Sequence, residues 1–327
     1  MTPNSYIDRL RSELDEALRA LAFPVQPEGL YEPIRYTLEL GGKRIRPILT
    51  LLACELFGGK RTDALPAAIA VEVFHNFTLL HDDIMDQAPL RRKQPTVHCK
   101  WDANTAILSG DRMQILAYEY LAQTPTGDLL EMLRVFNRTA AEVCEGQQFD
   151  MNFENSLEVS LDDYLEMIRL KTAVLLGAAL HIGALIGGAT NRQAEALYRF
   201  GVGMGMAFQL QDDFLDTYGD PQYFGKQIGG DIQANKKTFL LLSALQLATP
   251  AQHKQLLEAL ALPPEAAAEK LRRVKALYDE LELPRRCAEA IRYYYDEAQR
   301  ILNELEGDSR AKEELRNLAQ NLLYRED

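Results

Sequence analysis

Two short acidic motifs have the composition of a divalent-metal site. Asp82, Asp83 and Asp86 stand in LLHDDIMDQAPLRR (79–92), and the same Asp-Asp-x-x-Asp spacing recurs in FQLQDDFLD (208–216). Carboxylates that leave an apolar run are costly unless something cationic meets them. The sequence therefore predicts that a cation binds at both places.

The spacing of the aspartates favours magnesium. If both motifs are helical, Asp82 lies one turn from Asp86 and Asp212 one turn from Asp216, with the middle aspartate to one side. Like charges in that relation repel unless a counterion bridges them. Magnesium suits this arrangement because it uses one or two carboxylates and keeps its other positions for water and phosphate oxygens.

A third acidic cluster has an ordinary structural explanation. In SLDDYLE (160–166), Ser160 is a good helix N-cap, and Asp162, Asp163 and Glu166 occupy the start of the helix, where the dipole favours acids. The two Asp-Asp-x-x-Asp motifs instead close long apolar segments, where the dipole disfavours acids. Capping therefore does not account for them.

Three expected loops are rich in cations. GGKRIRP (41–47) contains three cations and precedes both aspartate motifs. QAPLRRKQPTVH (87–98) follows the first motif, and GDPQYFGKQIGGDIQANKKT (219–238) follows the second. The net charge of −12 over 327 residues excludes a broad basic surface for nucleic acid. An anionic ligand would depend on these local cations.

The composition is that of a globular protein with a sizeable core, with 47% hydrophobic residues. The four cysteines form no CxxC pair, and the charged N-terminus does not read as a secretory signal, so we expect a cytoplasmic protein. The apolar stretch 173–189 contains His181 and is short for a bilayer span, so we expect a buried helix and no membrane span.

Apolar residues recur at helical spacing along almost the whole chain. The expected helical segments are 4–22, 28–57, 64–86, 104–122, 127–155, 160–189, 191–218, 237–248, 251–260, 265–281, 286–306 and 309–324. No stretch alternates convincingly as a strand, and nothing marks a domain boundary. The sequence predicts an all-α fold with one domain over residues 1–327.

The motifs together resemble the all-trans isoprenyl diphosphate synthases, which condense isoprenyl units head to tail. The resemblance covers about residues 28–240 and weakens toward the C-terminus. The elements that carry it are GGKRIRP, HDDIMD…RR…PTVH, KT at 171–172, FQLQDDFLD and GK…GGDI…NKKT. It implies a bundle of ten or more helices around a central cavity.

The resemblance also implies roles for individual residues. The metal ligands, for three magnesium ions with substrate bound, would be Asp82, Asp83, Asp86, Asp212, Asp213 and Asp216. The allylic diphosphate (dimethylallyl, geranyl or farnesyl) would contact Arg91, Lys171, Lys226 and Lys236. Isopentenyl diphosphate would be held by Gly42, Lys43, Arg46, His75 and Arg92. The residues flanking the developing carbocation would be Thr172 and Gln209.

Several of these residues have structural alternatives. Lys236 and Lys237 would also suit a helix-start loop, and His75 lies at the spacing of a core residue. Gly146 and Gln147, in CEGQQFD, resemble a cavity-lining pattern of the family, but packing explains them equally well. The family's C-terminal basic residue has Arg325 as its nearest counterpart. The role of Arg325 is open.

Product length should depend on the helix before the first motif, because a chain growing away from the metals would run along it. Phe77 lies five residues before Asp82, Thr78 lies four before, and Phe74 is lower still. The resemblance implies that an aromatic residue at the position of Phe77 acts as a floor that limits the length of the growing chain. The expected product is a C20 all-trans diphosphate, with C15 close behind.

Other functions fit the sequence less well. A longer-chain synthase would need small residues at the floor, and a class I terpene cyclase would lack GGKRIRP and the full second aspartate motif. A non-catalytic synthase subunit would have lost aspartates. A di-iron bundle needs two Glu-x-x-His motifs, and only Glu72 to His75 matches. The resemblance also suggests a homodimer, for which the apolar helix 104–122 could supply the interface.

Overall fold

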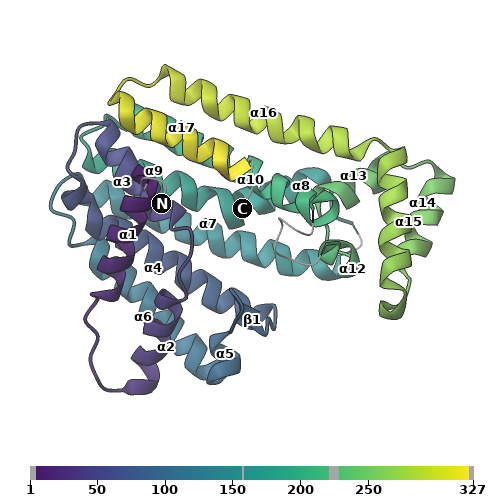
Figure 1. The fold of residues 1–327 in the computed structure, drawn as a ribbon, viewed down its shortest axis with the longest axis horizontal. Helices are drawn as coiled ribbons and strands as arrows, with labels where there is room; N and C mark the ends of the chain where they lie inside the picture. Colours follow the sequence, from purple (N-terminus) through teal and green to yellow (C-terminus); the bar gives the residue numbers. More distant parts are fainter. Residues whose placement is uncertain (1–4, 157, 221–227, 324–327) are drawn as a thin grey trace. The chain divides into compact units, whose positions relative to one another are not determined.

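The computed structural model describes residues 5–156, 158–220 and 228–323 without the side chain of Asn155, and this part of the chain is predominantly helical (Figure 1). The chain forms two compact units. The first comprises Met1–Asn137, Ala178–Tyr198 and Leu305–Leu315, and the second comprises the remaining segments, Arg138–Gly177, Arg199–Glu304 and Arg316–Asp327. The all-α prediction is confirmed. The single domain stays a prediction.

The first unit is organised around one long apolar helix that ends at the first aspartate motif. Its helices are α1 (Tyr6–Arg19), α2 (Glu28–Glu39), α3 (Ile45–Leu56), α4 (Arg61–Met85), α5 (Val97–Lys100) and α6 (Ala103–Leu121). Helix α4 packs against α3 and α6 and buries residues on nearly every side. It needs no polar stripe, because its neighbours cover it.

The second unit holds the other aspartate motif and a separate apolar core. Its elements are α8 (Leu161–Ile168), the π-helical turn η1 (Arg169–Ala173), α12 (Gly230–Gln233), α13 (Phe239–Leu247), α14 (Pro250–Leu260), the 3₁₀ turn η2 (Pro264–Ala266), α15 (Ala267–Glu280) and α16 (Leu283–Glu304). Four helices contribute residues to both units: α7 (Leu129–Asn155), α9 (Val174–Ile186), α10 (Asn191–Tyr218) and α17 (Ser309–Leu323). The core of the second unit includes Tyr164, Leu210, Phe239 and Tyr278.

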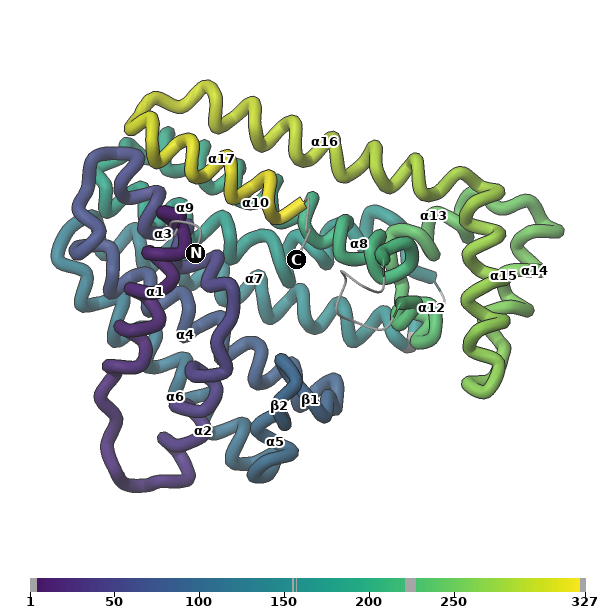
Figure 2. Tube along the Cα trace, in the orientation of Figure 1, coloured from purple at the N-terminus to yellow at the C-terminus, as the bar shows by residue number. Residues whose placement is uncertain are grey.

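Two of the places where the structure differs from the predicted helices lie in the first unit. The segment 28–57 is two helices, because Gly41, Gly42 and Arg44 all have positive φ and interrupt the helical path. The loop after α4 contains a small hairpin of two strands, β1 (Leu90–Arg91) and β2 (Gln94–Pro95), which the sequence pattern did not predict (Figure 2). Strands of two residues are too short to show alternation.

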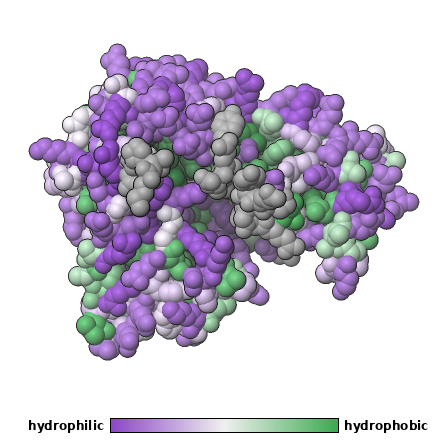
Figure 3. Space-filling view, in the orientation of Figure 1, coloured by the Kyte–Doolittle hydropathy of each residue, from purple (hydrophilic) through white to green (hydrophobic). Residues whose placement is uncertain are grey.

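The apolar stretch predicted as a buried helix lies within Leu161–Ile186, where α8, η1 and α9 run on without a break. This is the helix among the described residues with the length and composition to cross a membrane, but 83% of its most apolar window is buried inside the protein. That burial is typical of a core helix. Figure 3 shows hydrophilic side chains over most of the face it displays.

Helix α6 carries apolar side chains on its surface. Ile107, Leu108 and Ile115 are 45%, 59% and 55% exposed. They belong to the helix that was expected to supply the homodimer interface, and they are the residues that such an interface would cover. The homodimer itself stays a prediction.

Candidate active site

The first aspartate motif closes α4, as predicted. Asp83 is 5% exposed, and Arg91 donates to its Oδ1 from Nε at 2.8 Å and from Nη2 at 2.7 Å. The same guanidinium lies 3.6 Å from Asp82 Oδ2. Burial raises the pKa of Asp83, and Arg91 opposes that shift. The hairpin thus places Arg91 against the motif, where its guanidinium holds the carboxylate of Asp83.

The outer aspartates of this motif are more accessible. Asp82 is half-buried, and Asp86 is exposed as the C-cap of α4. They lie one helical turn apart, because the backbone N–H of Asp86 donates to the carbonyl of Asp82. Asp82 and Asp86 are therefore the members of the motif best placed to meet a ligand.

Four of the five residues expected to hold isopentenyl diphosphate meet pairwise in the first unit. A Cβ built on Gly42, whose φ is +140°, would lie 2.7 Å from Arg92 Nη2 and 2.9 Å from its Cζ. Only a glycine lets the Arg92 guanidinium lie this close to the loop. Arg46 Nη1 lies 3.1 Å from His75 Nε2. Lys43 belongs to the same loop and has an exposed side chain.

The Arg46–His75 pair fixes the protonation of the histidine. Desolvation and the charges of Arg46 and Arg92 hold the pKa of His75 well below its usual range, so the ring is neutral at physiological pH. Since a guanidinium only donates, Nε2 is the acceptor and Nδ1 carries the proton. Among the described residues, the buried Nε of Arg46 has no hydrogen-bond partner, which leaves a donor for a ligand.

The second aspartate motif lies in the second unit, near the end of α10. Its middle residue, Asp213, is 5% exposed and accepts hydrogen bonds from the Tyr164 hydroxyl and, at 3.2 Å, from Gln209 Nε2. Burial raises the pKa of Asp213 to about 6, against the lowering effects of Tyr164 and Lys236. As in the first motif, protein donors engage the middle aspartate.

The flanking aspartates of this motif are half-buried. Asp216 Oδ2 accepts from the backbone N–H of Asp231 at 2.9 Å. Burial, with the charge of Asp213, raises the pKa of Asp231 to about 7. Asp231 belongs to the GGDI stretch and adds a fourth carboxylate to this acidic region.

Lys171 and Thr172 lie on the π-helical turn η1. Lys171 Nζ forms an ion pair with Asp150 Oδ2 at 2.6 Å, and Thr172 Oγ1 donates to Gln209 Oε1 at 3.2 Å. Single π turns inside α-helices occur frequently at functional sites. This one presents Lys171 toward α7 and Thr172 toward α10.

Gly146 makes room for that turn. A Cβ on Gly146 would lie 2.3 Å from the backbone N of Lys171 and 2.7 Å from its Cα. Both contacts are with backbone atoms, so a side chain could be accommodated only if η1 moved. Of the two roles that the sequence leaves open for Gly146, cavity lining and packing, this close approach supports packing.

The remaining predicted cations divide between described and undescribed residues. Lys236 is exposed, and its charge lowers the pKa of Asp213. Lys237 Nζ donates to the Glu154 carbonyl at 3.3 Å, as suits a loop-fastening residue. Lys226 and Arg325 lie outside the described residues.

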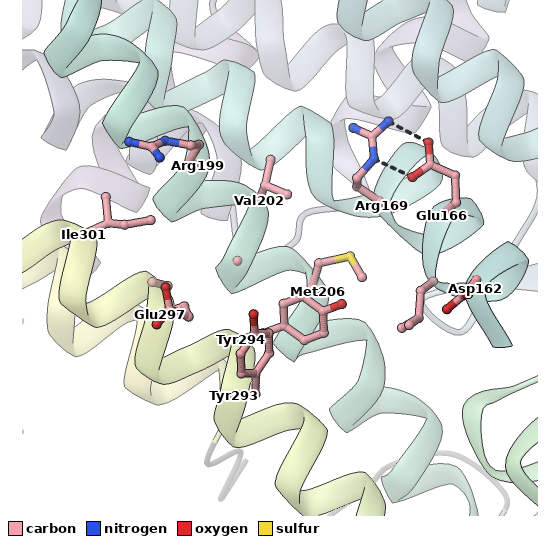
Figure 4. A pocket seen from close by; sticks show the side chains of 13 residues that line it. Asp162, Glu166, Arg169, Arg199, Val202, Met206, Tyr293, Tyr294, Glu297 and Ile301 are labelled. Carbon is pink, nitrogen blue, oxygen red and sulfur yellow. Dashed lines mark hydrogen bonds and ion pairs between the residues drawn. The ribbon is translucent and has the colours of Figure 1, made fainter.

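The third acidic cluster is a helix start, as predicted. Ser160 and Asp163 form a capping box on α8. Asp162 and Glu166 line a cavity of about 390 Å³ between α8, α10 and α16 (Figure 4). Glu166 accepts from Arg169 Nε at 2.7 Å and Nη2 at 2.8 Å, so its carboxylate is already engaged. None of the predicted site residues lines this cavity.

The aspartate motifs fit magnesium by their chemistry. Within the described segments, no three His, Cys, Asp or Glu side chains form a ready metal cage. Magnesium does not need one, because it is commonly held by one or two carboxylates with substrate phosphates completing the shell. The outer aspartates offer that kind of donor, because their carboxylates are more accessible than those of Asp83 and Asp213.

An aromatic column supports the predicted floor. Phe77 contacts Phe74 with ring centroids 5.5 Å apart, Phe74 contacts Phe136 at 5.1 Å, and Phe136 contacts Tyr118 at 5.1 Å. Phe77 is 8% exposed, and Phe74 is 1% exposed. Thr78 is half-buried, and its hydroxyl donates to the His75 carbonyl at 2.8 Å.

Comparison with known proteins gives the class. A geranylgeranyl diphosphate synthase of Methanosarcina mazei is 42% identical over 248 residues, 75% of this chain and 76% of that protein. A geranylfarnesyl diphosphate synthase of Natronomonas pharaonis is 42% identical over 259 residues, 73% of this chain and 76% of that protein. A crystal structure of a geranylgeranyl pyrophosphate synthase has a TM-score of 0.93 at 44% identity, covering 99% of this chain and 100% of that one.

These similarities define a trans-prenyltransferase that makes isoprenyl diphosphates. The profile of the family described as Polyprenyl synthetase matches residues 27–281. The chain belongs to the polyprenyl synthetase family. The terpene-cyclase and di-iron alternatives are excluded by this assignment.

Sequence reasoning missed several residues that hold the predicted ones in place. Asp150 pairs with Lys171, and Tyr164 holds Asp213; Glu72 binds Arg44, a loop residue that was itself not among the predicted ones. Each partner lies 21 to 49 positions away in the chain. The lone signal in the sequence was that Glu72, Asp150 and Tyr164 are polar residues within apolar helical patterns.

Proposed function

We propose that the protein condenses isopentenyl diphosphate head to tail with allylic diphosphates and releases an all-trans C20 diphosphate and pyrophosphate. The observation that supports this most is the arrangement of each aspartate motif. Protein donors hold the buried middle carboxylate, and the outer carboxylates are the more accessible ones, where metal-bound diphosphate would meet them. The arginine and histidine group with Gly42 suits the second diphosphate.

In this proposal Asp82, Asp86 and Asp212 are the principal magnesium ligands, with Asp216 in support. Bound magnesium would neutralise charge on the diphosphate as the allylic C–O bond breaks. Arg91 and Lys171 would each donate to diphosphate oxygens. Both are held by aspartates, so they are positioned before substrate arrives.

The second substrate supplies the electrons for the new bond. Arg46, Arg92 and Lys43 would bind the diphosphate of isopentenyl diphosphate and aim its double bond at the allylic cation. The double bond attacks the cation, and the product loses a proton that the released pyrophosphate accepts. Thr172 and Gln209 would offer oxygen dipoles to the developing cation.

The aromatic column Phe77, Phe74, Phe136 and Tyr118 supports the proposal of a C20 product. Large rings directly below the motif limit the length of a tail that runs along α4. The relatives named above include synthases of geranylgeranyl and geranylfarnesyl diphosphate. A C25 product is therefore the nearest alternative, on the longer side rather than the C15 side.

The purified chain should incorporate labelled isopentenyl diphosphate when given magnesium and a dimethylallyl, geranyl or farnesyl primer. Chromatography of the dephosphorylated products should show geranylgeraniol as the main species, and EDTA should abolish incorporation because the diphosphates then lose their counterions. A chain that incorporates nothing alone, yet does so with a second protein, would indicate a non-catalytic subunit. A cyclic hydrocarbon product would also contradict the proposal.

Replacing Phe77 with alanine should move the main product from C20 to C25. The substitution removes the first ring of the column but leaves Phe74, so the gain should stop after one or two isoprene units. Phe23→Ala, which removes a ring that contacts Tyr31 in the same unit, should leave the product unchanged. An unaltered product distribution for Phe77→Ala, measured on the same chromatogram, would refute the floor.

A further inference from the structure

A buried ion pair lies beside the predicted site for isopentenyl diphosphate. Arg44 is 4% exposed, and its guanidinium donates to Glu72 Oε1 at 2.6 Å, to Asp15 Oδ1 at 2.9 Å and to the Leu38 carbonyl at 2.7 Å. Those three acceptors engage all three nitrogens of the guanidinium. Arg44 is therefore engaged by the protein itself, although it stands between Lys43 and Arg46, which are predicted to bind substrate.

The backbone of Arg44 has a special conformation. Its φ of 50° and ψ of 35° are left-handed, and the residue is the N-cap of α3. A non-glycine residue is uncommon there and persists when its surroundings hold it. The side-chain contacts of Arg44 hold this turn, and the turn sets the directions in which Lys43 and Arg46 leave the loop.

Glu72 connects the loop to α4. It is 2% exposed, and its Oε1 also accepts from Asn76 Nδ2 at 3.0 Å. It precedes His75 by three residues, so both lie on one face of α4. Its negative charge raises the pKa of Arg46 and of Arg92, opposing the desolvation that lowers both. Glu72 is thus the buried ion-pair partner of Arg44, and its charge also favours the cationic forms of Arg46 and Arg92.

We propose that the Arg44–Glu72 pair positions the binding site for isopentenyl diphosphate without touching the substrate. Arg44 fixes the loop turn, and Glu72 fixes Arg44 to the helix that carries His75. The loop is then ordered before the diphosphate binds, so Lys43, Arg46 and Arg92 do not have to be organised by the substrate. This inference rests on the proposed function, because it takes isopentenyl diphosphate as the ligand of that cluster.

Stability alone is a weak reason for such a pair. Replacing both members of a buried ion pair by neutral groups is often tolerated, whereas removing one member leaves an uncompensated charge and is strongly destabilising. A role in stability and a role in positioning therefore give different results in a double variant.

The experiment compares Arg44→Gln, Arg44→Lys, Glu72→Gln and the double variant Arg44→Gln/Glu72→Gln. For each, Tm, kcat and the KM values for isopentenyl diphosphate and for the allylic primer are measured. Arg61→Gln is the matched control, because it removes an arginine that pairs with Glu13 and Glu55 on the surface of the same unit. The control should leave both KM values unchanged.

Arg44→Gln and Glu72→Gln should lower Tm and raise the KM for isopentenyl diphosphate about tenfold, with the primer KM within about twofold. Arg44→Lys keeps the charge and should recover part of that loss. The double variant should have a higher Tm than Arg44→Gln, with part of the loss remaining because Asp15 keeps its charge, and it should keep the raised KM for isopentenyl diphosphate. Its persistence in a stable protein is the signature of positioning.

Two results would overturn the inference. One is a double variant that regains a normal KM together with its Tm, since stability would then explain the pair. The other is an equal rise in both KM values, or no rise in either. Failure of the proposed function is distinguishable, because the unaltered protein would then show no saturable use of isopentenyl diphosphate.

Discussion

Asp82→Asn and Asp212→Asn should each lower kcat by about three orders of magnitude. Asparagine keeps the size of the side chain but loses the anionic oxygens that a hard cation prefers. Without a metal that stabilises the departing diphosphate, the activation free energy rises by several kcal/mol, and each 1.36 kcal/mol lowers the rate tenfold. Turnover with saturating substrates and magnesium measures the effect.

Substrate binding at the other site should change little in these variants. The cluster around Gly42, Arg46, His75 and Arg92 has its own contacts, so the KM for isopentenyl diphosphate should stay within about threefold. Asp162→Asn is the matched control. It removes an aspartate from the capping cluster of α8 and should leave kcat unchanged. A kcat within tenfold of normal for both motif variants would contradict the metal-binding role.

The sequence predicted what local patterns control. Apolar periodicity gave α10 its observed bounds, Asn191–Tyr218, and it placed both aspartate motifs near the ends of helices. Ser160 was recognised as an N-cap because its partner, Asp163, lies three residues away. Such features depend on residues that are close in the sequence, so the sequence alone is enough to predict them.

The features that escaped prediction depend on distant contacts. In the break between α2 and α3, the left-handed Arg44 is held by Asp15 and Glu72, which lie 29 and 28 positions away. The contact between Tyr164 and Asp213 spans 49 positions. The π turn η1 has no signal of its own in RLKTA, and the close approach of its backbone to Gly146 of α7 is a contact between residues more than 20 positions apart. No single-sequence pattern records which helices meet.

Gly146→Val should lower kcat/KM for the allylic primer about a hundredfold, because a small displacement of catalytic groups can cost that much. Any Cβ at this position would overlap the backbone of Lys171 and, at 2.8 Å, the carbonyl carbon of Leu170. The turn η1 would have to shift, carrying Lys171 away from Asp150 and Thr172 away from Gln209.

The KM for isopentenyl diphosphate should remain near normal, because its predicted ligands lie in the first unit. Gly203→Ala is the control: its Cβ would meet the Ala298 Cβ at 3.1 Å and the Tyr294 carbonyl at 3.2 Å, contacts that a slight adjustment relieves. Steady-state kinetics with each substrate varied in turn separates the two effects. If Gly146→Val behaves like Gly203→Ala, then the close approach of α7 to η1 is not what positions Lys171 and Thr172.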